Sequence, residues 1–193
     1  EELRLGIAEL DGALQGQTRL RAAAAETQDG YALESFSLAN PQLNASGQGD
    51  FVPGALDAQA ELSVPDLSVL GRGWSGGFKA NATLTEQDGT RFVDLTGTGQ
   101  DLTLGQENVD GALTGTTDLV VRAEERDGVI TLRDVRLNNE QVNAVAEGTY
   151  GPGVTDVTAQ LDIRSLASFG PGWRGSLDAD ASLRETGDGG RRL

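Results

Sequence analysis

The side chains that could do chemistry in this sequence are carboxylates, serines and two tryptophans. Histidine and cysteine are both absent, so the usual general bases, the thiol nucleophiles and most ligands of transition metals are missing. A serine such as Ser46 or Ser176 has no histidine with which to form a Ser-His-Asp triad. We therefore expect no catalytic residue and no enzymatic activity.

Paired carboxylates and the tryptophans are the remaining candidates for a site. Asp178 and Asp180 would share one strand face and could bind a hard cation such as Ca²⁺, but alternate aspartates are far commoner on a solvated face. Trp74 and Trp173 could be ligand platforms, although their place after a short helical turn favours packing anchors. No glycine-rich loop follows a strand and opens a helix, so we predict no metal and no cofactor.

The excess of acidic residues excludes several classes of partner. The chain of 193 residues carries 15 basic and 30 acidic residues, a net charge of −15. Such a surface repels nucleic acid and adsorbs poorly to anionic lipid headgroups, so any contact with lipid must use an apolar face. The sequence has no methionine, no signal peptide and no apolar run long enough to span a membrane. We expect it to be an excerpt of a longer polypeptide.

The sequence repeats at an interval of 99 residues. The segment LANPQLNASGQGDFVPG from Leu38 returns as LNNEQVNAVAEGTYGPG from Leu137, and 137 − 38 = 99. The tryptophans give the same interval, since 173 − 74 = 99. We predict a first β-repeat unit at 1–99 and a second, incomplete unit at 100–193 that is continuous with it. Repeat units pack on their neighbours, so the array is expected to continue on both sides.

Apolar and polar residues alternate along most of the chain, which indicates antiparallel strands with one apolar face each. The strands of one unit are predicted near 2–10, 12–25, 31–38, 41–51, 55–64, 76–86 and 91–104, the tail of the last being the counterpart of the first. Asp-Gly pairs at Asp29, Asp88, Asp127 and Asp188 are signals for tight hairpin turns.

The apolar positions of this alternation form what we call the predicted apolar set. Its members are Leu56, Ala58, Ala60, Leu62, Val64, Phe78, Ala80, Ala82, Leu84, Leu113, Leu119, Val121, Val142, Ala144, Ala146, Val157, Ala159, Leu161, Ile163, Leu177, Ala179, Ala181 and Leu183. A short helical turn, at Asp66–Leu70 and again at Ser165–Phe169, is expected to be capped by its first residue. Glycines inside the strands permit sharp bending, so a strongly curved sheet and an ordinary sandwich with a sealed core both remain open.

One long stretch of the chain resembles a known family. The run LSVPDLSVLGRGWSGGFKANATL, followed by TRFVDLTGTGQDLTLGQENVDGALTGTTDL, is similar to the TamB family, the translocation and assembly module subunits of Gram-negative bacteria. That family is related to the AsmA-like proteins, and the likeness is to alphaproteobacterial members in particular. It covers nearly the whole chain in both copies. The resemblance implies an all-β fold of repeated antiparallel strands in one long curved sheet, a taco-like groove with one short helical turn per repeat.

The resemblance also implies a function. Proteins of this family are anchored in the inner membrane, extend through the periplasm, and are linked to phospholipid movement between the two membranes and to outer-membrane protein assembly with a β-barrel partner. This sequence would be a middle piece of the groove, with the predicted apolar set lining a path for phospholipid acyl chains. The barrel partner would bind through regions outside it. The alternatives are a structural or adhesive β-repeat, such as a stalk or passenger with a sealed core and no ligand, and a hydrolase or sugar-active enzyme that uses paired carboxylates.

Overall fold

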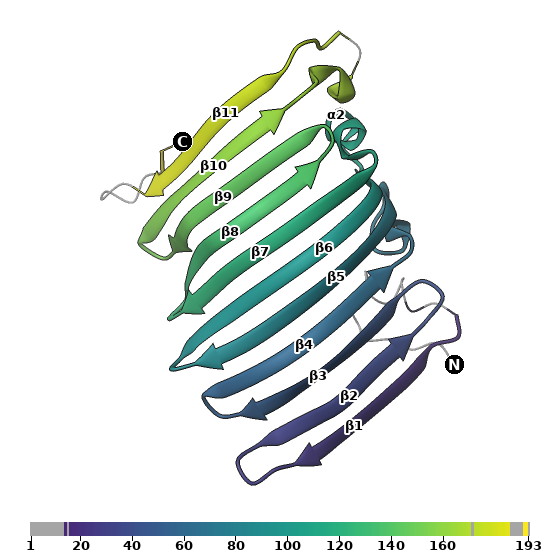
Figure 1. Ribbon diagram of the computed structural model, residues 1–193, viewed down its shortest axis with the longest axis vertical. Helices are drawn as coiled ribbons and strands as arrows, with labels where there is room; N and C mark the ends of the chain where they lie inside the picture. The colour runs from purple at the N-terminus through teal and green to yellow at the C-terminus, as the bar shows by residue number, and fades with distance from the viewer. Residues whose placement is uncertain (1–13, 15, 171, 186–190, 193) are drawn as a thin grey trace.

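The computed structural model describes residues 14, 16–170, 172–185 and 191–192. These residues form one sheet of 12 strands in which the strand order follows the chain from β1 to β12 (Figure 1). The pairings between neighbouring strands are antiparallel, as short connections between consecutive strands require. The prediction of an all-β fold with repeated antiparallel strands is confirmed. The sheet is open and does not curl round into a trough, so the taco-like groove stays a prediction.

The strand boundaries follow the sequence pattern closely in the first unit. The strands are β1 (Arg19–Glu26), β2 (Tyr31–Ala39), β3 (Asn44–Val52), β4 (Ala55–Val64), β5 (Trp74–Gln87), β6 (Thr90–Leu104), β7 (Thr116–Arg126), β8 (Val129–Asn139), β9 (Val142–Gly151), β10 (Val154–Ile163), β11 (Leu177–Glu185) and β12 (Arg191–Arg192). The predicted strand at 12–25 is wrong in its first half, because β1 begins only at Arg19. Gly16 has a φ of 94°, which interrupts extended pairing, and the buried Leu14 belongs to a core cluster. The predicted strand at 2–10 lies outside the described residues.

The hairpin turns agree only in part with the Asp-Gly signals. At Asp88–Gly89 φ is 52° and 72°, and at Asp127–Gly128 it is 54° and 77°, the pair of positive values that defines a type I′ turn. Asp29–Gly30 is different, because neither residue has a positive φ and the connection is closed by the Thr27 N–H, which donates to the Gly30 carbonyl at 2.9 Å. The fourth signal, at Asp188, lies outside the described residues.

Short helical segments stand beside the sheet. They are η1 (Leu67–Val69), α2 (Glu107–Asp110), η2 (Gly111–Leu113) and η3 (Leu166–Phe169). Asp66 caps η1, since its Oδ1 accepts from the Ser68 N–H at 2.9 Å, whereas the Ser165 side chain makes no cap bond to η3. The α2–η2 segment was not predicted, so a single helical turn per repeat is too few for the second unit.

Leu113 is the member of the predicted apolar set that the structure places elsewhere. It lies in η2 and is buried, while β7 begins at Thr116. Its spacing from Leu119 imitates strand alternation, but the chain is held off the sheet by two aspartates. The Asp101 Oδ1 accepts from the Gly115 N–H at 2.9 Å and the Asp110 Oδ1 from the Leu104 N–H at 2.7 Å.

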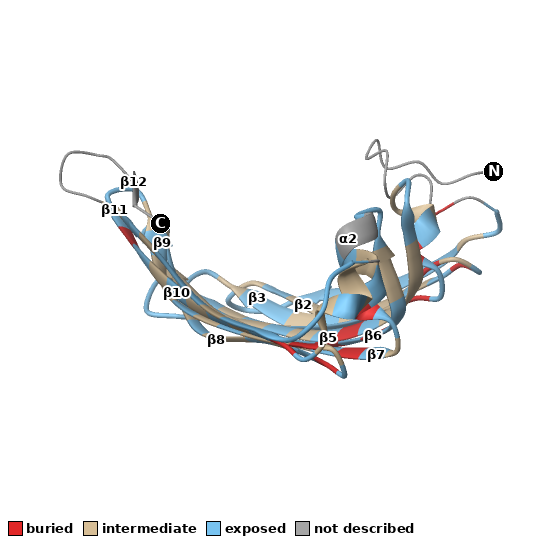
Figure 2. Cartoon of the chain, turned by 90° about the horizontal axis from the view of Figure 1, so that it is seen from above, coloured by how far each residue is buried: buried red, intermediate tan, exposed pale blue. Residues whose placement is uncertain are grey.

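Two buried clusters, each at the helical end of the strands, form the core. The first contains Leu14, Leu43, Val64 and Leu67, and the second contains Ala112, Val142 and Ile163. The clusters are related by the sequence repeat, since 142 − 43 = 99 and 163 − 64 = 99. Seen from above, the layer is bowed and α2 lies on the inner side of the bow, near most of the buried residues (Figure 2). The core therefore occupies one end of one face and leaves the rest of that face uncovered.

The tryptophans are not buried anchors. Trp74 lies against Gly71, where an added Cβ would be 3.1 Å from the indole, yet its residue is 41% exposed. Trp173 is 59% exposed. Neither belongs to the two buried clusters, which are filled by aliphatic residues, so neither tryptophan anchors the core.

Candidate functional site

The strand register gathers apolar residues into three rows that cross the sheet. The middle row is Phe36, Gly47, Ala60, Ala82, Leu95, Val121, Val135, Ala146, Ala159 and Ala181. The helix-side row is Leu38, Ala45, Leu62, Ala80, Gly97, Leu119, Leu137, Ala144, Leu161 and Ala179, and the far row is Leu33, Gly49, Ala58, Leu84, Val93, Ala123, Leu132, Gly148, Val157 and Leu183. We call these three rows the apolar face.

The predicted apolar set maps onto this side of the sheet, apart from Leu113. Not all of it is accessible, however, because Ala80 is only 7% exposed, and Val64, Val142 and Ile163 are buried beneath the helical segments. These three residues belong to the core and would not line a path. That the remaining members line a lipid path stays a prediction.

Several residues of the apolar face were missed because bulges break the period of two. In β2 the face is carried by Leu33 and then by Phe36, three residues later, and the pairing of β2 with β3 is irregular between them. The same shift separates Leu132 from Val135 in β8. A bulge adds one residue to a strand, so each later side chain points to the opposite face from the one that a period of two predicts. Simple alternation therefore cannot follow the apolar face through these strands.

The apolar face is not covered by a second sheet of this chain, since the described strands all belong to one layer. Leu62, in the helix-side row, is 37% exposed although it is apolar. A hollow of about 330 Å³ lies over β2 to β4, lined largely by apolar side chains such as Leu33, Phe36 and Phe51. An apolar surface that is largely half-buried or exposed, on an acidic protein, indicates a place where an apolar partner binds.

Glycines on the apolar face allow neighbouring strands to approach closely. A Cβ added to Gly47 would lie 2.8 Å from the Gln59 carbonyl oxygen, and one added to Gly49 would lie 2.7 Å from that of Asp57. Gly148, in the same row as Gly49, also has no room for a Cβ and has a φ of 135°. Only glycine fits at such positions, because the backbone of the neighbouring strand approaches closely on the apolar side.

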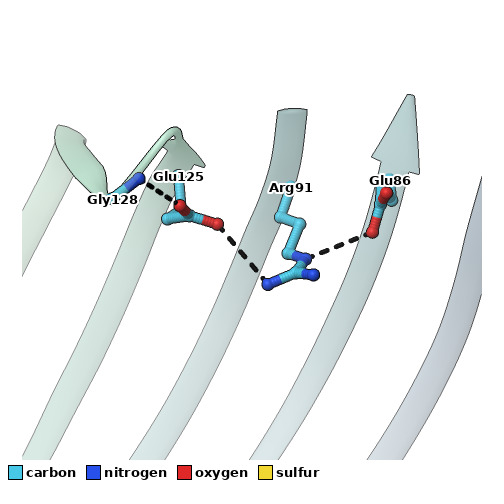
Figure 3. A network of polar contacts seen from close by, with 4 residues as sticks. All are labelled: Glu86, Arg91, Glu125 and Gly128. Carbon is cyan, nitrogen blue, oxygen red and sulfur yellow. Dashed lines mark hydrogen bonds and ion pairs between the residues drawn. The ribbon is translucent and has the colours of Figure 1, made fainter. Parts of the chain in front are cut away.

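One end of the apolar face is closed by the core clusters, and at the other end the strands β5 to β7 carry a charged network that we call the polar margin (Figure 3). Arg91 Nε lies 3.1 Å from Glu86 Oε2 and Arg91 Nη1 lies 3.6 Å from Glu125 Oε2. Glu125 is held in turn by the Gly128 N–H, which donates to its Oε1 at 2.8 Å. The register pairs Arg91 with both glutamates, two residues beyond the far row, so all three point to the apolar side.

The opposite face is polar and carries a similar network. Arg122 Nε lies 3.2 Å from Asp94 Oδ1, and Arg122 Nη1 lies 3.0 Å from Asp134 Oδ2. A hollow of about 930 Å³ lies on this polar side over β7 to β11 and includes Arg122 and Asp180 in its lining. We do not regard it as the site, because it presents no continuous apolar wall.

Two aspartates face each other on the polar side. Asp178 pairs with Asp162 in the register of β10 and β11. A hydrogen bond and charge repulsion from Asp162 raise the pKa of Asp178 above its usual 3.8, with smaller contributions from desolvation and from Asp180. Among the described residues no group of three or more carboxylates is placed to hold a metal ion, so the pair of Asp178 and Asp180 gains no support as a calcium site.

We expect Asp178→Asn to stabilise the protein at neutral pH. The raised pKa means that the folded chain binds this proton more tightly than the unfolded chain, so the contribution to stability is present below pH 3.8 and is lost as the pH rises through the raised value. An asparagine at this position carries no charge to repel Asp162, so the stability that is lost when Asp178 ionises is retained. The melting temperature should therefore rise at neutral pH and change little in acid. Asp162→Asn should give a similar gain, and the double variant should add little to either, whereas independent gains would contradict the coupling.

Comparison with known proteins does not identify this architecture. No protein-family model, no curated protein and no solved structure matches this chain. The resemblance to the TamB family therefore depends on the sequence motifs alone. Within the described residues, no helix is both long enough and apolar enough to cross a membrane.

Proposed function

We propose that this chain is a segment of a hydrophobic β-groove that conducts phospholipids across the periplasm and supports outer-membrane biogenesis. The observation that carries the proposal is the apolar face, three continuous rows of apolar side chains that cross 10 strands from β2 to β11 and that no second layer of the described chain covers. Rows that run across the strands make a track along the length of the sheet, which suits movement of a ligand from one repeat to the next.

The chemistry of the rows suits acyl chains. Transfer of a CH₂ group from water to such a surface gains about 0.8 kcal/mol, and a row of alanine, valine and leucine gains nearly the same amount at each strand. A lipid can therefore slide without crossing a polar barrier. Small residues such as Ala60, Ala82 and Ala159 in the middle row leave space for a chain to lie against the backbone, and no polar group interrupts that row.

The bow of the layer and the crowded glycines support a groove. Gly47, Gly49 and Gly148 lie on the apolar side, where the neighbouring strand leaves no room for a Cβ. Further repeats stacked along the long axis with the same bow, which Figure 2 shows from above, would lengthen it into a trough. We further propose, on the motif resemblance alone, that the parent protein is anchored in the inner membrane and that an outer-membrane β-barrel partner binds it through regions outside this sequence.

Photolabelling tests the proposal. A phospholipid with a diazirine near the end of one acyl chain is incubated with the 193-residue chain and irradiated, and the adducts are counted by mass spectrometry. We expect saturable labelling that an excess of unlabelled phospholipid suppresses, because the probe and the competitor share the apolar face. A structural or adhesive repeat with a sealed core would show no saturable labelling, and that result would overturn the proposal.

A further inference from the structure

We infer that the polar margin, formed by Glu86, Arg91 and Glu125, contacts the headgroup of the bound lipid and favours a zwitterionic phospholipid that ends in a primary ammonium group. This inference rests on the function proposed above and deepens it. It assigns a direction to the lipid on the sheet, with the headgroup at the polar margin and the acyl chains pointing along the strands toward the helical segments.

The polar margin is the place on the apolar side where a headgroup could be recognised. By the register, Arg91 is the only basic residue of β1 to β11 that lies on this side of the sheet. The other end of the face offers no equivalent, because Val64 and Val142 are buried there under the helical segments. A lipid on the three rows can therefore place its polar end at one margin only.

The width of the apolar face agrees with this direction. Along β7, Glu125 is followed on the same side by Ala123, Val121 and Leu119, none of which is buried, and 125 − 119 gives a separation of six residues. At about 3.3 Å per residue, the distance along the strand from the polar margin to the helix-side row is about 20 Å. Half of the hydrocarbon thickness of a bilayer, the depth that one acyl chain spans, is about 15 Å. A lipid that lies along the strands therefore fits between the margin and the core clusters.

The charges of the margin select the kind of headgroup. A guanidinium is a good partner for phosphate, and Arg91 has a side chain that is 57% exposed and can reach a ligand. The two glutamates exceed the arginine by one charge, so the network as a whole is negative. An ammonium group is attracted to Glu86 or Glu125, whereas an anionic headgroup meets two carboxylates on a chain whose net charge is already −15.

The network is held ready for a ligand. Glu125 keeps its position through the Gly128 N–H at 2.8 Å, and Glu86 is 20% exposed at its side chain, against 34% for Glu125. Fixed carboxylates lose little freedom when they bind an ammonium group. The matched network of Asp94, Arg122 and Asp134 lies on the polar face. That face lacks the three apolar rows that would hold an acyl chain, so this network serves as the control.

The test compares the lipids that the chain extracts from vesicles. Vesicles of equal parts phosphatidylethanolamine and phosphatidylglycerol are incubated with the protein and removed, and the protein-bound lipids are quantified by mass spectrometry. We expect phosphatidylethanolamine to be enriched by up to about fivefold, the most that one exposed ion pair supplies. In the double variant Glu86→Gln/Glu125→Gln the ratio should fall to one or below, because only the arginine then remains charged at the polar margin. Asp94→Asn/Asp134→Asn should keep the enrichment.

The outcomes separate the inference from the proposed function. Bound lipid without enrichment, or enrichment that survives Glu86→Gln/Glu125→Gln, would overturn the headgroup assignment and leave the acyl track intact. The absence of any bound phospholipid in the unsubstituted chain would overturn the proposed function, and the headgroup assignment with it. Arg91→Gln provides a further check, because loss of the phosphate contact should weaken the binding of both lipids, while the enrichment of phosphatidylethanolamine should persist because both glutamates remain.

Discussion

Ala60→Asp and Ala159→Asp are each expected to reduce phospholipid binding about tenfold or more, because a carboxylate pressed against an acyl chain costs more than about 1.4 kcal/mol. The two alanines occupy equivalent places in the middle row, since 159 − 60 = 99. Neither is buried, so a new carboxylate can be solvated in the lipid-free protein and the fold should survive. The measurement is equilibrium binding of a fluorescent phospholipid to each purified variant.

The matched controls add the same charge one residue away on the other face. Gln59→Asp and Thr158→Asp place a carboxylate on the polar side, and the register keeps these residues away from the three rows. Their lipid binding should equal that of the unsubstituted chain. Equal losses on both faces would show that charge alone weakens binding, and equal tolerance on both faces would show that the middle row does not contact lipid.

Asn139→Ala is expected to cause the largest loss of stability among single substitutions of polar residues. The Asn139 side chain is 3% exposed, and its Nδ2 donates to Thr117 Oγ1 at 2.8 Å and to the Thr116 carbonyl at 3.0 Å. Its Oδ1 accepts from the Gln141 N–H at 2.9 Å. Removal leaves the buried Thr117 hydroxyl without its donor, at about 1–3 kcal/mol, and breaks hydrogen bonds to two part-buried backbone groups, at about 0.5–1.5 kcal/mol each, so we expect a loss of about 2–5 kcal/mol.

Thermal unfolding followed by circular dichroism measures this loss. For a chain of this size, 1 kcal/mol corresponds to a change of about 2–4 °C in melting temperature, so Asn139→Ala should lower it by about 5–15 °C. Asn138→Ala is the control, because the neighbouring side chain is exposed. Asn40, the equivalent of Asn139 in the first unit, donates to Thr18 Oγ1 at 2.8 Å, so Asn40→Ala should also be destabilising. A change below about 2 °C for Asn139→Ala would contradict the assignment.

The sequence predicts strands well where alternation is uninterrupted. The range 55–64 was predicted and observed as β4 without a change of boundary, because Leu56 to Val64 alternate without a bulge and both ends carry turn residues. The prediction fails where tertiary contacts decide. Leu113 has the spacing of a strand residue but packs in η2, and the first half of the range 12–25 leaves the sheet so that Leu14 can enter the first cluster.

The candidate site was also predictable only in part. The apolar face was predictable in the strands without bulges, where it depends only on which residues alternate, but not in β2 and β8. The polar margin was not, because Glu86 and Arg91 beside a hairpin turn look like ordinary solvated charges in the sequence. Their common face, and their meeting with Glu125 from β7, depend on the register of three strands. Register across several strands is set by turns and bulges together, and alternation within one strand does not determine it.

The position of a bound acyl chain on the sheet shows directly whether the apolar face binds lipid. Peptide mapping of the diazirine adducts reports contact residue by residue and does not depend on knowing the direction or the rate of transport. We expect adducts on the middle and helix-side rows, such as Phe36, Ala60 and Leu161, and few on polar-face neighbours such as Gln59 and Gln160. Adducts spread evenly over both faces, or confined to the polar face, would contradict it.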